Sequence, residues 1–124
     1  MDSQPQNLPK LGPRQLKLVE ALESGEYTQI RHWLKKRGCF CVIGVAYEIS
    51  GLGEWESLSG GSAHIYKFED GSEALLGVKE PLAEYYKLDP DDLLMHQNDT
   101  EGKTFKEIAA EIREYPQSYF TEAA

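Results

Sequence analysis

The side chains with the most reactive chemistry in this chain are two cysteines and three histidines. Cys39 and Cys41, with His32, His64 and His96, are of the residue types that bind zinc. Structural zinc sites combine two Cys or His pairs at characteristic spacings, whereas this chain has a single Cys-x-Cys pair. The pattern favours burial of both cysteines as small apolar side chains. We therefore expect no metal and no cofactor.

Acidic residues in the C-terminal third suggest a calcium site. They are Asp89, Asp91, Asp92, Asp99 and Glu101. If Gly102 is placed at the glycine position of an EF-hand loop, Gln97 and Ile108 fall where the first and last carboxylate ligands belong. Neither residue is acidic. Helix capping and turn formation explain these carboxylates better than calcium does.

Nucleophilic catalysis needs a base and an orienting group close to the nucleophile. No Gly-x-Ser-x-Gly motif and no cysteine-protease signature occurs in the sequence. The glycines at 51–53 and 60–62 lack the lysine and the spacing of a phosphate-binding loop. The sequence therefore predicts a protein that is not an enzyme. An enzyme would need a pocket that joins His64 or His96 to a carboxylate.

A basic and aromatic cluster occupies residues 31–37. Its candidate ligand-binding residues are Arg31, Trp33, Lys35 and Arg37. Cations beside an aromatic ring can hold a phosphate or a nucleotide. The same pattern also fits a solvated basic face with one buried tryptophan, so both interpretations remain open.

Charge is distributed unevenly over the 124 residues, whose formal net charge is −8. Residues 1–40 carry a net charge of +3, and residues 41–124 carry one of −11. An acidic surface repels phosphate, so we expect no direct binding of nucleic acid. Such a surface suits a basic protein partner. Tyr85 and Tyr86, together with the acidic residues named above, form the predicted partner-binding surface.

Length and apolar content predict a single domain with one core. We expect a flexible leader at 1–12, a globular domain at 13–116 and a frayed tail at 117–124. No apolar run is long enough to cross a bilayer, and the first residues lack a secretory signal. These observations predict a soluble cytoplasmic protein that does not bind membranes. Its oligomeric state is not predicted.

Hydrophobic spacing predicts the helices that frame this domain. Pro13 begins a helix that ends at Ser24-Gly25. The apolar segment 39–50 predicts a helix buried nearly all round, in which Gly44 marks the close approach of another element. A further short helix begins at Pro81, and a turn after Asp89 contains Leu93 to Met95. Thr104 and Glu107 form a capping box for the closing helix.

The remaining segments predict a small antiparallel hairpin. Residues 65–68 and 74–77 flank the turn at 69–72, which contains an Asp-Gly pair. Residues 30–36 fit a short helix or a strand equally well, and residues 51–63 are expected to form a loop that holds Trp55. The fold class is therefore α+β, with four or five short helices packed against a small antiparallel hairpin or sheet.

Three stretches of the chain resemble a family of small uncharacterised proteins from phages, prophages and bacteria, including cyanobacteria. They are Ala21–Gln29, Cys39–Val45 and Leu94–Ala109. The family pattern reads Leu-x-Ser-Gly-x-Tyr-x-Gln, then Cys-x-x-Gly-Val, then Asn-Asp-x-x-Gly-x-Thr-Phe-x-Glu-Ile-Ala. Family members often have adjacent cysteines, which Phe40 separates here, and a later Cys-Asp pair, where this chain has Tyr47-Glu48. The resemblance implies the same fold and an association with mobile elements, and no established activity.

Taken together, these observations predict a non-enzymatic binding protein of phage or prophage type. It would modulate a host or bacterial protein through its acidic, tyrosine-rich surface. The alternative is a protein that binds or sequesters a small molecule or nucleotide at residues 31–37.

Overall fold

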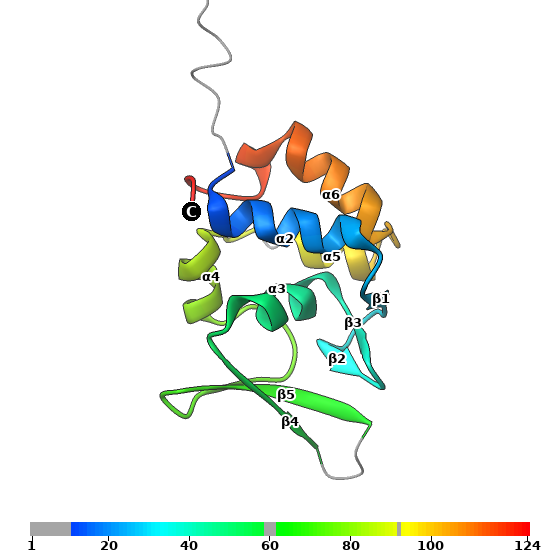
Figure 1. Cartoon of the computed structure of the whole chain (residues 1–124), viewed down its shortest axis with the longest axis vertical. Coiled ribbons are helices and arrows are strands. Elements are labelled where there is room, and N and C mark those ends of the chain that lie inside the picture. The colour runs from blue at the N-terminus through cyan, green and yellow to red at the C-terminus, as the bar shows by residue number, and fades with distance from the viewer. Residues whose placement is uncertain (1–10, 59–61, 92) are drawn as a thin grey trace, which may run out of the picture.

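A layer of helices covers one side of a small sheet (Figure 1). The computed structural model describes residues 11–58, 62–91 and 93–124. Its helices are α2 (Pro13–Ser24), α3 (Val42–Ser50), α4 (Glu80–Tyr86), α5 (Leu93–Asp99), α6 (Phe105–Glu114) and the short 3-10 helix η1 (Pro116–Ser118). Helix α3 lies between the sheet and the other helices, which makes it the centre of the molecule (Figure 1).

The sheet contains six short strands among the described residues. They are β1 (Thr28–Gln29), β2 (Lys35–Lys36), β3 (Cys39–Phe40), β4 (Gly53–Ser57), β5 (Ala63–Phe68) and β6 (Glu73–Ala74). The strand order is β1-β3-β2-β5-β4, and β6 pairs with β5. Strands β1 and β3 are parallel, and the other pairs are antiparallel. The α+β class is confirmed, although the sheet is mixed and larger than the predicted hairpin.

The apolar segment 39–50 is divided between a strand and a helix. Cys39 and Phe40 form β3, and Cys41 caps α3 by accepting a hydrogen bond from the Gly44 amide at 3.3 Å. Burial of every residue from Cys41 to Tyr47 confirms that this segment forms the centre of the core. The prediction of one continuous helix was wrong. Strand β3 forms by pairing with β1 and β2, and the sequence alone did not identify either of these segments as a strand.

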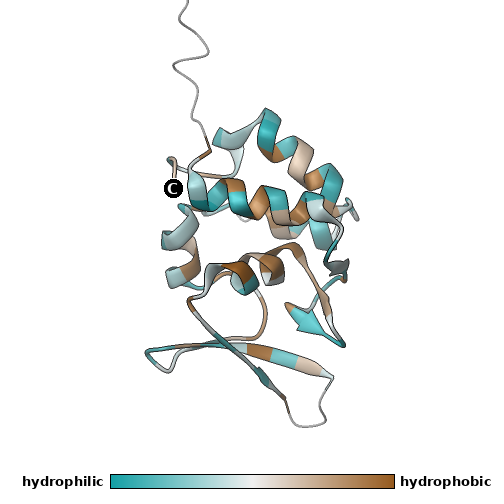
Figure 2. Cartoon of the chain, in the orientation of Figure 1, coloured by the Kyte–Doolittle hydropathy of each residue, from teal (hydrophilic) through white to brown (hydrophobic). Residues whose placement is uncertain are grey.

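Gly44 marks a close approach, as its position in an apolar helix predicts. A Cβ atom built on Gly44 would overlap the carbonyl oxygen of Leu34. The chain before β2 therefore lies directly against α3. Figure 2 shows the apolar residues gathered in α3 and the facing strands, and polar residues on the outer side of α6.

The hairpin of β5 and β6 forms as predicted, with a shorter returning strand. Part of the expected loop at 51–63 is instead strand β4, because Gly53 to Ser57 pair with His64 to Phe68, and residues 59–61 lie outside the described residues. Trp55 lies opposite Tyr66 in this pairing, and the two rings are 4.9 Å apart. Aromatic packing on the inner face stabilises strand β4, which the Gly- and Ser-rich sequence does not predict.

The capped helix α6 is confirmed, since Thr104 accepts a hydrogen bond from the Glu107 amide and Glu107 accepts one from the Thr104 amide. The tail after Pro116 is not frayed. Tyr119 and Phe120 are buried, and Leu88 forms a β-bridge with Phe120. Two apolar residues near the end of a polar segment are hard to recognise as core residues from the sequence. In the structure, Tyr119 and Phe120 close one side of the core.

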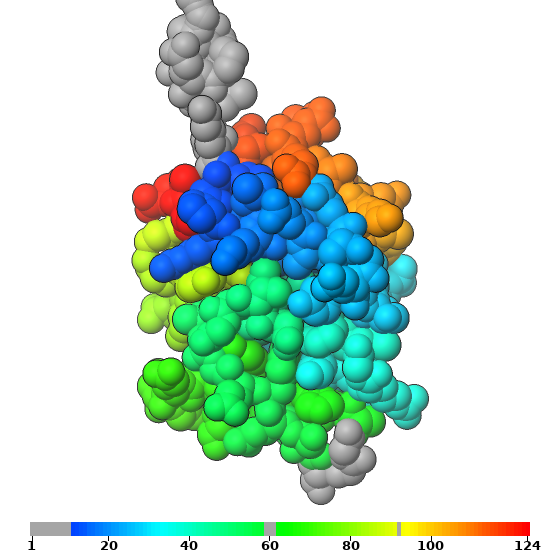
Figure 3. All heavy atoms as spheres, viewed as in Figure 1, coloured from blue at the N-terminus to red at the C-terminus, as the bar shows by residue number. Residues whose placement is uncertain are grey.

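The other end of the chain joins the same region. Residues 1–10 of the predicted leader lie outside the described residues. Gly12 is buried and forms the N-cap of α2, so it belongs to the folded part. Gln15 is also buried, and its amide group donates to the carbonyl oxygens of Tyr86 and Glu122. Figure 3 shows α2 in contact with the C-terminal segment.

Candidate functional site

Residues from three separate stretches of the chain, Ala21–Gln29, Cys39–Val45 and Leu94–Ala109, meet at one buried hydrogen-bond network. Asn98 is fully buried, and its side-chain oxygen accepts hydrogen bonds from the Val42 amide and the Gln29 side chain. Its nitrogen donates to the Ile30 carbonyl oxygen at 3.0 Å. Gln29 also accepts a hydrogen bond from the Phe105 amide. These residues hold β1, α3, α5 and α6 together, which gives them a structural role.

The basic and aromatic cluster at 31–37 is divided between the two faces of the sheet. Successive strand residues point to opposite sides. The Lys35 amine lies 5.2 Å from the Phe40 ring centre and 5.4 Å from that of Trp55. The Lys36 amine lies 4.6 Å from the Trp33 ring centre. Trp33 and Lys35 therefore do not share one surface.

The two arginines of that cluster also lie apart. The Arg31 guanidinium rests against Gly102, in the turn before α6. Arg37 is exposed in the tight turn between β2 and β3, with a φ of 54°. A nucleotide site that uses Arg31, Trp33, Lys35 and Arg37 together has no single surface in this structure.

The predicted tyrosine surface is wrong for Tyr86. This side chain is fully buried, and its hydroxyl donates to the Ala46 carbonyl oxygen at 2.8 Å. Burial raises the pKa of Tyr86 well above its usual value. Tyr85 is half-buried beside it, with the Arg14 guanidinium 4.2 Å from the ring centre. Tyr86 is a core residue because α4 packs onto α3 through it.

The acidic residues of the predicted surface fall into two groups. Asp89 and Asp91 lie between α4 and α5, and Asp92 is outside the described residues. Asp99 lies at the end of α5, where it accepts hydrogen bonds from the His32 amide and the Asn98 side chain. Glu101 follows in the next turn. Because α5 separates the two groups, these carboxylates do not form one patch.

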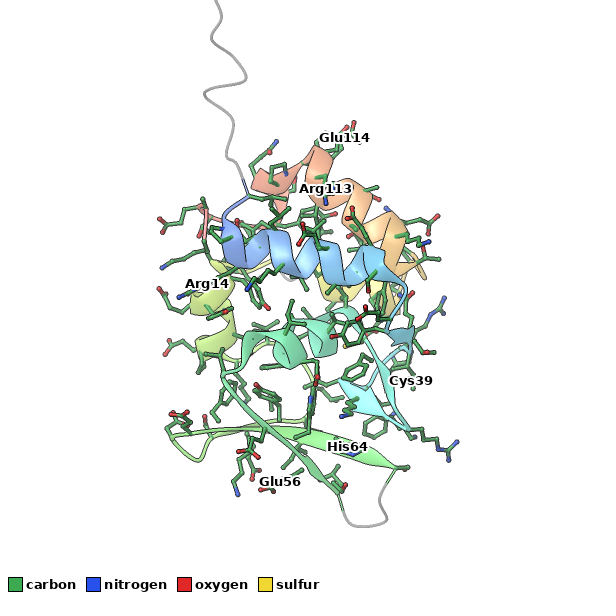
Figure 4. All side chains as sticks on the ribbon, in the orientation of Figure 1. Arg14, Cys39, Glu56, His64, Arg113 and Glu114 are labelled. Atoms are coloured by element: carbon green, nitrogen blue, oxygen red, sulfur yellow. The ribbon has the colours of Figure 1, made fainter. Side chains whose placement is uncertain are left out.

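The cysteines lie in different environments. Cys41 is fully buried, and burial raises the pKa of its thiol to about 11. Cys39 is half-buried in β3, beside the exposed turn (Figure 4). Within the described ranges, no three Cys, His, Asp or Glu side chains come close enough together to hold a metal ion.

Two histidines have partners that are relevant to catalysis. His64 Nε2 lies 3.3 Å from the Ser57 hydroxyl, whereas its Nδ1 is buried and has no hydrogen-bond partner among the described residues. A serine and a histidine without an orienting carboxylate do not make a triad. His96 lies 3.3 Å from Glu101, and both side chains are exposed. Neither histidine lines the hollows of about 290, 240 and 440 Å³ in the described part of the chain.

The outer face of the sheet carries a group of exposed and half-exposed apolar side chains. The inner side of β5 presents Tyr66 and Phe68 to α3, so Ile65 and Lys67 point outward. Four apolar side chains on this outer side are Leu58, Ile65, Leu75 and Leu76. They line an open hollow of about 440 Å³ together with Glu73 and Lys79. Leu75 and Leu76 are 40% and 51% exposed.

No described element covers this outer face, since the helices all lie on the opposite side of the sheet (Figure 1). Strands β4 to β6 and their turns surround the apolar group with five carboxylates. They are Glu54, Glu56, Glu69, Asp70 and Glu73. Lys67 is the single cation in this stretch, and it pairs with Glu56 at 3.4 Å. Glu56 lies on the side of the sheet away from α3 (Figure 4). We call these apolar and acidic residues the docking face.

The docking face is not apparent from the sequence, because the Gly- and Ser-rich residues 51–63 are typical of a loop. Once β4 pairs with β5, Leu58 and Ile65 fall on the same side. The alternation along β5 was a usable signal, since it leaves Ile65 outside while Tyr66 and Phe68 point inward.

Comparisons with known proteins do not assign this chain to a family. No family model, no curated protein and no solved structure matches this chain. Among the described helices, none has the length and apolar character needed to span a membrane.

Proposed function

We propose that this protein is a non-enzymatic binding protein whose docking face receives a basic, amphipathic segment of a partner protein. The observation that carries the proposal is the pair of exposed leucines, Leu75 and Leu76, set in an acidic surround. Exposed leucines grouped in one hollow are a feature of interaction surfaces. The acidic side chains select a partner that is rich in lysine or arginine.

Charge and shape point to the same kind of partner. The stretch from Gly53 to Leu76 holds five acidic residues and one lysine, and Lys79 adds one further cation at the hollow, so negative charge predominates around the exposed leucines. An open hollow suits the apolar side of a helix or an extended segment rather than an enclosed small ligand. In the setting of a phage or prophage, the partner would be a host protein whose activity changes on binding.

The test compares retention of a defined partner by matched variants. Proteins captured from a bacterial lysate are identified, expressed and assayed in purified form against the wild type and the double variant Leu75→Ser/Leu76→Ser. Leu16→Ser, a half-buried leucine on α2, is the control. We expect the double variant to lose at least tenfold in affinity while the control stays within twofold. Circular dichroism confirms that each variant is folded.

Charge is tested separately. Glu69→Lys/Glu73→Lys should weaken binding, and raising the salt from 0.05 M to about 0.5 M should weaken binding of the wild type, because screening shortens the reach of charges. A partner that binds the leucine variant and the wild type equally would contradict the proposal. So would a partner whose contact segment is acidic.

The nucleotide alternative has its own measurement. A nucleotide present at about 100 times its Kd stabilises a protein by about 2.7 kcal/mol, which a thermal-shift assay detects. We expect no shift with nucleotides, because Lys35 and Trp33 lie on different faces. A shift that Arg31→Ala and Arg37→Ala abolish would favour the alternative.

A further inference from the structure

A second site lies away from the docking face, between α3, α4, α5 and the C-terminal segment. It is a cavity of about 290 Å³. Six of the twelve residues that line it have aliphatic side chains: Ile43, Val78, Ala83, Leu88, Leu93 and Leu94. The elements that surround it are fixed by hydrogen bonds, because the Asp89 amide donates to the Tyr119 carbonyl oxygen and the Thr121 amide to that of Lys87.

The size of the cavity limits its occupant. Apolar cavities of about 150 Å³ hold benzene. A cavity of about 290 Å³ is roughly twice that size, so it accommodates two fused rings or an aliphatic group of similar bulk. An apolar wall of this kind binds such a group by removing it from water.

Polar groups at the cavity define the charge of the occupant. They include Lys79, Glu80, Asp89 and Ser118. Lys79 and Glu80 are exposed and solvated, whereas Asp89 is half-buried. One Asp89 oxygen accepts a hydrogen bond from the Asp91 amide, and no cation of the described residues lies within 4.0 Å of this carboxylate. A charge on a partly apolar wall interacts more strongly with a ligand than a solvated charge does.

We infer that this cavity binds a small molecule with an apolar ring system and a protonated amine. The rings occupy the space between Ile43, Ala83 and Leu94, and the ammonium group donates to the Asp89 carboxylate. Ser118 also lines the wall. The inference does not depend on the docking face, since only Lys79 lines both hollows.

The experiment uses three probes that share the indole ring. Tryptamine is cationic, indole is neutral and indole-3-acetate is anionic at pH 7. Binding to the full chain is followed by titration calorimetry and by thermal shift. We expect tryptamine to bind at least tenfold more tightly than indole, and indole-3-acetate to bind most weakly.

Three variants test whether the probes bind in this cavity. Asp89→Asn keeps an oxygen that can accept the Asp91 amide but removes the charge, so it should lower tryptamine affinity at least tenfold and leave indole binding unchanged. Asp91→Asn is the matched control, because Asp91 is exposed and does not line the cavity. Ala83→Phe fills the cavity and should abolish binding of all three probes, with folding checked by circular dichroism.

The inference is overturned if none of the probes binds, if indole-3-acetate binds as tightly as tryptamine, or if Asp89→Asn and Asp91→Asn have the same effect. If Ala83→Phe fails to fold, the two Asp variants still decide the outcome.

Discussion

At the scale of single residues, burial rather than reactivity describes the cysteines. Cys41 accepts the Gly44 amide at the start of α3 and is fully buried, so its thiol is a structural group. Thiolate formation there would place a negative charge inside the core, and this is why burial raises the pKa of Cys41. Reactive cysteines have a lowered thiol pKa, whereas the thiol pKa of Cys41 is raised.

The raised pKa of Cys41 predicts a loss of stability in alkali. The folded state holds the thiol proton up to a pKa of about 11, and the ordinary value is 9.0. Above pH 9 the folded state binds more protons than the unfolded chain, so the stability from this group is complete below pH 9 and falls as the pH rises towards 11. A difference of about two pKa units corresponds to at most about 2.7 kcal/mol.

Urea unfolding at pH 7, 9, 10 and 11 measures this loss. Cys41→Ser should show a shallower decline between pH 9 and 11 than the wild type. Cys39→Ser should follow the wild type, because that thiol is not fully buried. Parallel curves for the two variants would show that Cys41 does not titrate as the structure implies. Tyr86, whose pKa is also raised, adds to the decline in all three proteins.

At the scale of elements, the approach between α3 and the chain before β2 controls the packing. Gly44→Ala would drive a Cβ into the Leu34 carbonyl oxygen, which cannot rotate away. We expect a loss of at least about 3 kcal/mol in unfolding free energy, at the upper end of overpacking effects. Denaturant unfolding measures it.

Gly51→Ala is the control for Gly44→Ala. Gly51 ends α3 with a φ of 70°, and no atom lies within 4 Å of an added Cβ. The strain of a left-handed alanine costs about 1 kcal/mol. Helix propensity alone would make Gly44→Ala stabilising. A loss at Gly44 no larger than the loss at Gly51 would therefore mean that contact with Leu34 does not control the packing.

Some helices and strands can be predicted from the sequence, and others cannot. Helix α2 carries a start signal at Pro13 and a stop signal at Gly25, and helix α6 carries a start signal in the capping box of Thr104 and Glu107. Strand β4 carries none, since its stability comes from Trp55 packing against the facing strand and α3. Local signals predict elements that are stabilised locally.

At the scale of the whole molecule, the two ends of the described chain close the helical layer. Phe120 is buried and bridges to Leu88, and Gln15 links α2 to both α4 and the segment after η1. Phe120→Ala should therefore cost about 3–5 kcal/mol, as for other buried phenylalanines.

Thermal and denaturant unfolding of Phe120→Ala measure this contribution. Tyr115→Ala is the matched control, because Tyr115 is 48% exposed and should change stability by less than about 1 kcal/mol. If both variants lose less than about 1 kcal/mol of unfolding free energy, the segment after η1 is loosely attached, as the sequence predicts.

The sequence by itself determined the α+β class, the bounds of the capped helices, the buried centre around Gly44 and the acidic character of residues 41–124. Each follows from local periodicity, capping or composition, which need no distant partner. Tertiary structure alone decided which side chains meet. It placed Lys35 and Trp33 on different faces, buried Tyr86, and left Ile65, Leu75 and Leu76 together on an uncovered face. Strand pairing and helix packing fix these positions between residues far apart in the chain, and only the outward position of Ile65 has a local signal, in the alternation along β5.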